Sequence, residues 1–221
     1  MNNIQIKLTP MKKAMAKQMI KGLEIPQFQL ETELDCTKLM KLRKDVSYKP
    51  SVTSVLAFAT AQILKKHDIF NASWGDGTYI EMHDQIGLGI AADTSKGLVV
   101  PVIHDAGSLE LKGIHEALEI IKEKSQKGNF SIDEITGGTF TISNLGMYNI
   151  TSFKALVNFP QAAILALSKI AERPIITNGK VTSAMIMRIT LSIDHRIADG
   201  AAGAEFLCDL AELIKNPEEL F

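Results

Sequence analysis

The sequence of 221 residues has little cysteine and no long hydrophobic run. Its two cysteines, Cys36 and Cys208, lack the CxxC or metal-ligand spacing of a redox or zinc site, so we expect both to be small buried side chains. The longest apolar run, residues 55–64, is interrupted by Thr60 and Gln62. It is far shorter than the roughly 20 residues that cross a bilayer, so no membrane-spanning segment is expected.

Neither sign of charge is in excess, with 24 Lys and Arg against 25 Asp and Glu and a formal net charge of -1. Nucleic-acid binding needs clustered basic residues that this balance does not supply, so we expect no nucleic-acid partner. Met1 is followed by Asn2, Asn3 and Gln5 rather than by the apolar stretch of a secretion signal. We therefore expect a cytoplasmic protein, or one of the mitochondrial matrix if its source is eukaryotic.

The sequence is 46% hydrophobic and 22% charged, a composition typical of a soluble globular protein with a sizeable core. Apolar residues recur every three or four positions from Pro10 to Gly22, as in an amphipathic helix, and alternate with polar ones from Phe28 to Leu34, as in a half-buried strand. By such patterns, helices are predicted over residues 10–22, 37–46, 51–66, 108–127 and 201–214. Strands are predicted over residues 28–34, 79–80, 86–91, 97–102, 136–142, 162–167 and 184–193, with a tight turn over 71–78.

Three residues mark expected boundaries: Ser108 caps the fourth helix, Gly128 ends it, and Pro101 indicates a sheet edge or a bulge. Helices and strands alternate without a regular βαβ period, and no internal repeat is visible. The pattern predicts one α/β domain with a mixed sheet flanked by helices.

The most informative segment is SIDHRIADG, residues 192–200, where four ionisable residues follow a predicted strand and precede a predicted helix. Charged groups crowd together at Asp194, His195, Arg196 and Asp199, and strand-to-helix junctions are common positions for functional sites. An imidazole can take and return a proton near neutral pH. His195 is therefore the leading candidate for a general base.

This segment resembles the DHRxxDG motif of dihydrolipoyl acyltransferases, the E2 components of 2-oxoacid dehydrogenase complexes, whose catalytic domain is similar to chloramphenicol acetyltransferase. Asp194 stands where the related acetyltransferases and peptide-synthesis condensation domains have a second histidine, which favours the E2 family. Five further blocks resemble the family in the same order: residues 11–19 (MKKAMAKQM), 25–28 (IPQF), 92–102 (ADTSKGLVVPV), 137–146 (GGTFTISNLG) and 159–167 (FPQAAILAL).

The resemblance implies acyl transfer between dihydrolipoamide and coenzyme A, without a metal. His195 matches the general base that takes the proton of the coenzyme A thiol, and the hydroxyl of Ser143 matches the donor to the tetrahedral oxyanion. Asp199 matches a third position where some relatives carry asparagine, so an orienting role is expected. Arg196 is expected to be the structural partner of a carboxylate. Ser143 has a structural alternative, as a turn hydroxyl.

Coenzyme A contacts are carried over by resemblance to branched-chain members of the family. Arg43 is chemically suited to a phosphate, although a solvated charge at a helix end is equally expected. Lys122 lies near a polar contact of those relatives but differs in type, and Gln18 stands where many relatives have arginine; neither is carried over. The expected coenzyme A contacts, besides Ser143, are Arg43, Ser51, Asp93, Asn144 and Ser168.

The resemblance also implies an architecture. Residues 1–221 are expected to be the catalytic domain alone, without the lipoyl domain and without the small domain that holds the E1 and E3 components. An excised core is expected rather than a naturally short protein, although the sequence leaves both open. The family's domain is a trimeric building block, with His195 and Asp199 of one chain facing Ser143 of its neighbour. Trimers join into shells of 24 or 60 subunits through C-terminal residues. A lipoyl domain would then bring the acyl group from outside this chain.

Two alternatives to the acyltransferase remain open from the sequence. One is a catalytically silent scaffold core of such a complex, although the silent relatives lack the histidine that stands here at position 195. The other is an acetyltransferase of the same fold that acts on a hydroxyl acceptor. The acyl group is not fixed by these residues, but residues 11–28 resemble branched-chain members more than acetyl or succinyl types.

Overall fold

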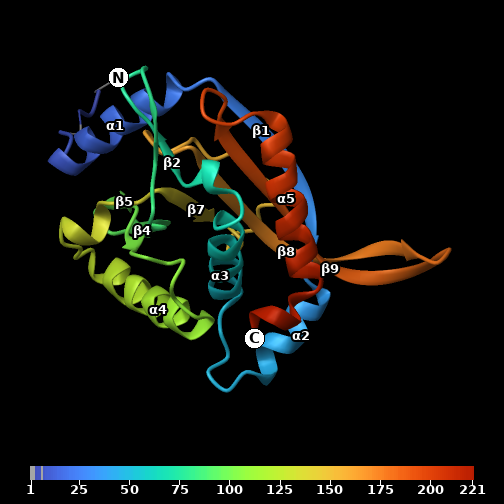
Figure 1. The fold of residues 1–221 in the computed structure, drawn as a ribbon. Helices are drawn as coiled ribbons and strands as arrows, with labels where there is room; N and C mark the ends of the chain where they lie inside the picture. The colour runs from blue at the N-terminus through green and yellow to red at the C-terminus, as the bar shows by residue number, and fades with distance from the viewer. Residues whose placement is uncertain (1–2, 6) are drawn as a thin grey trace.

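The computed structural model of the protein describes residues 3–5 and 7–221, and it confirms the expected α/β fold with a mixed sheet (Figure 1). Its helices are α1 (Pro10–Leu23), α2 (Thr37–Asp45), α3 (Val52–Leu64), α4 (Leu111–Lys127) and α5 (Gly200–Lys215), with short 3-10 turns at Asp68–Phe70, Asp133–Ile135 and Pro217–Leu220. Its strands are β1 (Gln27–Asp35), β2 (Ala72–Trp74), β3 (Ile80–Met82), β4 (Leu88–Thr94), β5 (Gly97–Val99), β6 (Val102–Ile103), β7 (Phe140–Asn144), β8 (Ala163–Thr177) and β9 (Lys180–Asp194).

The main sheet has the strand order β1-β9-β8-β7-β4-β5, with β6 paired to β4. The β4–β7 and β7–β8 pairs are parallel, and the other pairs are antiparallel. A separate two-stranded sheet joins β2 to β3. Because β7 and β9 are separated by β8, the ends of these two strands, which carry the predicted catalytic residues, belong to different parts of the sheet.

Strands β8 and β9 are much longer than predicted and form an arm that projects beyond the helices (Figure 1). Asn178 and Gly179 connect them with φ values of 52° and 74°, as in a tight hairpin turn. Most side chains of the arm are exposed, among them Ile176 and Val181. The sequence predictions of a strand end at Leu167 and a start at Ala184 were wrong because the arm has no buried face to impose alternation.

Helix boundaries follow local capping chemistry. The hydroxyl of Ser51 accepts the N–H of Ser54 at 3.0 Å at the start of α3, and Gly128 ends α4 with a left-handed φ of 59°, as expected. The expectation that Ser108 caps α4 was wrong. The helix begins at Leu111, because the Ser108 hydroxyl instead donates to the backbone oxygen and carboxylate of Asp105, at 2.9 and 2.7 Å.

Two strand predictions also need correction. The segment predicted as a tight turn contains β2, which pairs with β3 and forms an isolated bridge between Ser73 and Gln161. The strand predicted over residues 97–102 is split into β5 and β6 at Pro101. Proline has no N–H for the ladder, but its carbonyl accepts the N–H of Ile90 at 2.8 Å, so the chain stays beside β4.

The core lies between the sheet and helices α3, α4 and α5, with α3 in contact with both other helices. Phe206 on α5 packs at its centre, with ring centroids 5.2 Å from Phe70 and 5.9 Å from Phe140. Cys36 is buried as expected, and burial raises the pKa of its thiol to about 12. Cys208 is exposed on α5, contrary to expectation. Among the described residues, no helix is long and apolar enough to cross a membrane.

Candidate active site

The turn that carries His195 follows directly from the end of β9. The N–H groups of Ile197 and Ala198 both donate to the backbone oxygen of Asp194, at 2.9 and 3.1 Å, and so close the turn. The N–H of His195 donates to the backbone oxygen of Pro26 at 3.0 Å. Its ring meets Phe28 edge to face, with centroids 5.2 Å apart, and is otherwise exposed. The turn is thus anchored, while the imidazole can still reach a substrate.

A buried ion pair holds the same turn from within. The carboxylate of Asp194 has no exposed surface, and it accepts Nε and Nη2 of Arg196 at 2.9 and 2.6 Å. The hydrogen bond to Asp194 raises the pKa of Arg196. The guanidinium lies over the ring of Trp74, 4.3 Å from its centroid. The expected structural role of Arg196 is confirmed, because the fork of its donors neutralises a charge that burial would otherwise penalise.

Asp199 lies at the start of α5, four residues after His195. Its carboxylate accepts the N–H of Ala202 at 2.9 Å as the helix cap. The side chain is exposed and, among the residues described, makes no hydrogen bond with the imidazole of its own chain. Within one chain, the Asp199 carboxylate thus contacts the start of α5, and its expected orienting role stays a prediction.

Ser143, near the end of β7, lines a cavity of about 850 Å³ whose opposite wall is α4. Within the described part of the chain, its hydroxyl has no hydrogen-bond partner, so it is available to a ligand. The neighbouring Asn144 amide donates to the Thr53 hydroxyl at 2.8 Å and accepts the N–H of Gly146 at 2.7 Å, which fixes the strand end against α3. Four of the predicted binding or catalytic residues line this one cavity: Ser51, Asp93, Ser143 and Asn144.

Two predicted coenzyme A contacts do not line the cavity. Arg43 donates from Nη1 to the backbone oxygen of Pro50 at 3.0 Å, directly before Ser51, so it supports the loop beside the cavity. Ser168 is buried and donates to the backbone oxygen of Arg188 at 2.5 Å, between β8 and β9.

The α4 wall supplies lining residues that sequence reasoning missed or set aside. Lys122 lines the cavity and is paired with Glu119 of the same helix at 3.1 Å. Ser125 and Gln126 line it one turn further along. Helical spacing could have identified these polar residues, because they flank the buried positions Leu118 and Ile121 on the helix.

Gln18, which was set aside as a coenzyme A contact, lies on α1. Its amide donates to the side-chain oxygen of Asn158 at 3.0 Å and to the backbone oxygen of Phe159. It thus ties α1 to the segment before β8. The start of β8 pairs with the end of β9, so this segment lies at the same end of the sheet as His195.

The register of the sheet separates the two predicted catalytic groups within one chain. Ser143 is opposite Ala166, and Ala166 is opposite Thr190, whereas His195 lies five positions further along the chain than Thr190. Two strand spacings and five residues of rise put their backbones roughly 15–20 Å apart. The cavity that contains Ser143 accordingly contains neither His195 nor Asp199. A single chain does not bring the predicted catalytic residues together.

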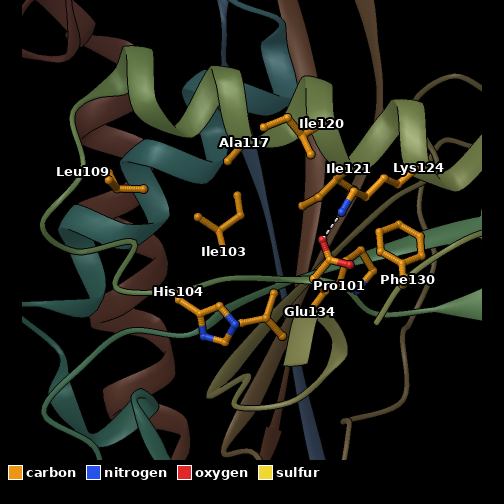
Figure 2. A pocket seen from close by; sticks show the side chains of 11 residues that line it. Pro101, Ile103, His104, Leu109, Ala117, Ile120, Ile121, Lys124, Phe130 and Glu134 are labelled. Atoms are coloured by element: carbon orange, nitrogen blue, oxygen red, sulfur yellow. Dashed lines mark hydrogen bonds and ion pairs between the residues drawn. The ribbon is translucent and has the colours of Figure 1, made fainter. Parts of the chain in front are cut away.

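A second, smaller cavity of about 250 Å³ touches α4 on another face, through Ala117, Ile120 and Lys124 (Figure 2). Figure 2 shows apolar side chains around it and an ion pair between Lys124 and Glu134 at its edge. None of the predicted catalytic or coenzyme A residues lines this cavity.

Comparison with known proteins covers nearly the whole chain. Residues 2–221 match the family described as 2-oxoacid dehydrogenases acyltransferase (catalytic domain). The dihydrolipoyllysine-residue acetyltransferase component of the pyruvate dehydrogenase complex from Rickettsia felis is 35% identical over 215 residues, covering 93% of this chain and 52% of that protein. The succinyltransferase component of the 2-oxoglutarate dehydrogenase complex from Rickettsia typhi is 37% identical over 196 residues, 85% of this chain and 49% of that protein. The chain therefore spans about half the length of these relatives.

Solved structures give the same picture. The cubic core of a pyruvate dehydrogenase multienzyme complex superposes with a TM-score of 0.93 and 28% identity, over 99% of this chain and 94% of that one. Chloramphenicol acetyltransferase has a TM-score of 0.62 and 14% identity, over 96% and 98% of the two chains, and so shares the fold.

The dihydrolipoamide acetyltransferase of Azotobacter vinelandii superposes with a TM-score of 0.94 and 27% identity, over 99% of this chain and 94% of that one. That structure comes from a study of a serine, a histidine and an asparagine in the catalytic mechanism of the enzyme. There the serine precedes the histidine by 52 positions and the asparagine follows it by 4. Ser143, His195 and Asp199 have the same spacings.

Proposed function

This chain belongs to the 2-oxoacid dehydrogenase acyltransferase family, as its catalytic domain, and we propose that it transfers an acyl group between a dihydrolipoyl thiol and the thiol of coenzyme A. The observation that carries the proposal is the spacing of Ser143, His195 and Asp199, which equals that of the three residues studied in the Azotobacter vinelandii enzyme. The silent scaffold alternative is disfavoured because the histidine is present.

His195 is proposed as the general base. Its imidazole takes the proton of the coenzyme A thiol, and the sulfur forms a bond to the thioester carbonyl carbon. The bond to the dihydrolipoyl sulfur then breaks, and the imidazole returns the proton to that departing sulfur. One thioester is exchanged for another, so atoms and charge balance without an oxidant. The exposed ring on an anchored turn supports this role, because a base needs both access and a fixed direction.

Ser143 is proposed as the donor to the oxyanion that forms between these steps. Its hydroxyl has no partner in the described part of the chain and faces a cavity rather than the core. An oxyanion gains most from a donor already held in place, and Asn144 holds this strand end through Thr53 and Gly146.

The cavity beside Ser143 is the proposed coenzyme A site. Its volume of about 850 Å³ is within the range of small-molecule sites. Hydroxyl and amide groups of Ser51, Ser125 and Gln126 line it, and Lys122 contributes a positive charge to the lining. Asp93 and Asn144 are proposed to contact the coenzyme within the cavity. Arg43 and Ser168 are proposed to support its walls, since neither lines it.

The complete site is proposed to form between copies of this chain in a homotrimer. Roughly 15–20 Å of backbone separation within one chain is too far for a base and an oxyanion donor to act on one carbonyl. If His195 and Asp199 of one copy face Ser143 of the next, thiol and thioester can meet between them. The resemblance to a cubic multienzyme core supports further assembly into a shell of 24 or 60 subunits.

The same reasoning extends to the partners. The acyl group is proposed to arrive on a lipoyl domain, which residues 1–221 do not contain, and the E1 and E3 components are proposed to bind through a separate small domain. The relatives compared above are named for acetyl and succinyl transfer, so the resemblance to branched-chain members stays a prediction. A location in the cytoplasm, or in the mitochondrial matrix if the source is eukaryotic, is likewise only proposed.

The test is acyl transfer by the purified, folded chain from acetyl, isobutyryl, isovaleryl and succinyl coenzyme A to free dihydrolipoamide. We expect a rate with one donor class that depends on His195. A matched set of reactions offers chloramphenicol as a hydroxyl acceptor. Transfer to chloramphenicol alone would replace the proposal with the hydroxyl acetyltransferase, and no transfer by an assembled protein would favour the silent scaffold.

A further inference from the structure

Trp74, the single tryptophan of the chain, lies against the charged pair beneath His195. It ends β2, a strand that the sequence pattern did not predict. The backbone N–H of Trp74 donates to the backbone oxygen of Pro160 at 2.8 Å. Two residues further on, the N–H of Ala162 donates to Ala72, and the carbonyl of Ala162 accepts the N–H of Asp194 at 2.8 Å. The backbone of Trp74 is therefore tied to the same strand end that carries the turn with His195.

The Arg196 guanidinium lies between two different environments. One edge faces the fully buried carboxylate of Asp194, and the side chain still has 27% of its surface exposed. A guanidinium with access to water can rotate away and leave the carboxylate partly unpaired. The indole, 4.3 Å from the guanidinium carbon, covers one face of this group and attracts its charge. Stacking thus limits the guanidinium to the orientation in which it donates to Asp194.

His195 lies between Asp194 and Arg196 in the chain, so the orientation of this ion pair sets the direction of the His195 backbone. We propose that Trp74 is a positioning residue for His195 that acts through Arg196 and Asp194. This inference rests on the proposed function of His195 as the general base. A small displacement of a reacting group has a large effect on rate, so the loss of the indole face is expected to lower turnover. Trp74 does not line the cavity beside Ser143, so the affinity for coenzyme A should not change.

The first test compares Trp74→Met, which fills the space without an aromatic face, with Trp74→Phe, which keeps a face. We expect Trp74→Met to lower kcat about 10-fold, with KM for coenzyme A within about twofold of wild type, and Trp74→Phe to recover most of the loss. The control is Tyr79→Leu, which removes an exposed ring from the same β2–β3 hairpin. Unchanged kcat in Trp74→Met, or equal loss in Tyr79→Leu, would overturn the inference.

A double-mutant cycle tests the path. Arg196→Lys keeps a positive charge but lacks the planar fork that both donates to Asp194 and stacks on Trp74. If Trp74 acts through Arg196, adding Trp74→Met to Arg196→Lys causes little further loss of kcat. Losses that multiply would show that Trp74 acts by another route.

A spectroscopic readout separates this inference from the proposed function. The chain has five histidines, so 13C labelling at Cε1 gives five signals, and His195→Gln assigns the one of interest. Trp74→Met and Arg196→Lys should each shift the His195 signal and leave in place that of His115, which contacts the Ser54 hydroxyl near the start of α3. A wild-type protein without activity but with these shifts would refute the proposed function and retain the link to Trp74. An unmoved His195 signal in both folded variants would refute the link.

Discussion

The two ends of the proposed site are built in different ways. The turn with His195 is held by a buried ion pair, three backbone hydrogen bonds and two aromatic rings, and it presents one exposed imidazole. The end of β7 with Ser143 instead borders a cavity and has a hydroxyl without a partner among the described residues. The first end is rigid and small, whereas the second is open and lined by several polar groups.

This difference indicates a division of labour. A base that moves a proton needs a fixed direction, which the network around Asp194 supplies. A site that accepts a large thiol substrate needs volume and unpaired donors, which the cavity supplies. Since the two ends lie apart in one chain, assembly is proposed to bring them together, and neither end has to satisfy both requirements.

The largest expected effect is at the rigid end. His195→Ala should lower kcat by about 10² to 10⁴, the contribution of a positioned general base. The ring is exposed and contacts Phe28 at its edge, so the fold and the assembly should persist. Steady-state acyl transfer measures the loss, with gel filtration as the control for assembly. Wild-type turnover in an assembled His195→Ala protein would show that another group is the base.

Removing the charge that supports the turn should cost stability. Arg196→Leu leaves the fully buried carboxylate of Asp194 without its cation, and breaking such a pair costs about 3–5 kcal/mol. The exposed fraction of Arg196 places the expected loss at the lower end of that range. Urea unfolding of the variant and of the wild type measures it. A loss below about 1 kcal/mol would mean that water or another group replaces the guanidinium.

At the open end, the expected effect is on rate alone. Ser143→Ala should lower kcat by about 10² to 10³, the typical cost of losing one donor to an oxyanion, with little change in KM for coenzyme A. Ser125→Ala is a matched control, because it removes a hydroxyl that lines the same cavity but donates to the backbone oxygen of Ile121 on its own helix. A change confined to KM would assign Ser143 to binding.

The smallest effect concerns a half-buried ion pair that contrasts with the fully buried carboxylate of Asp194. The hydrogen bond from Lys124, with further donors from Ser131, lowers the pKa of Glu134 to about 2 (Figure 2). Because the pKa is lower in the folded state, this stabilisation is complete above the unfolded pKa of about 4.3 and is lost as the pH falls toward about 2.

Lys124→Met should raise the pKa of Glu134 and flatten the dependence of stability on pH in that window. Thermal unfolding between about pH 2 and pH 5 measures the change, and Lys112→Met, at an exposed pair on α4, is the control. An identical pH profile in both variants would show that the two Ser131 donors alone hold the Glu134 carboxylate.

Much of the fold could be predicted because local periodicity and capping decide it. The apolar alternation in β1, the 3/4 spacing in α1 and the glycine after α4 each indicated the element that forms. The arm of β8 and β9 was missed because its side chains are mostly exposed on both faces. Cys208 was placed inside because cysteine is commonly buried, whereas its position on α5 faces solvent.

The site was only partly readable for a similar reason. The charges around His195 are adjacent in sequence, so the pairing of Arg196 with Asp194 could be predicted. Trp74 could not, since its glycine-rich surroundings resemble a turn and its contact joins segments more than a hundred residues apart. The distance between His195 and Ser143 depends on strand order, which the sequence pattern does not specify.

The most direct test of a site shared between copies is complementation. The His195→Ala and Ser143→Ala proteins are each purified, mixed, dissociated and reassembled, and native mass spectrometry verifies mixed oligomers. A shared site predicts that the mixture regains activity well above either variant alone, because some interfaces then join an intact His195 to an intact Ser143. Mixed oligomers that remain as inactive as the separate variants would contradict the account and place both residues in the site of a single chain.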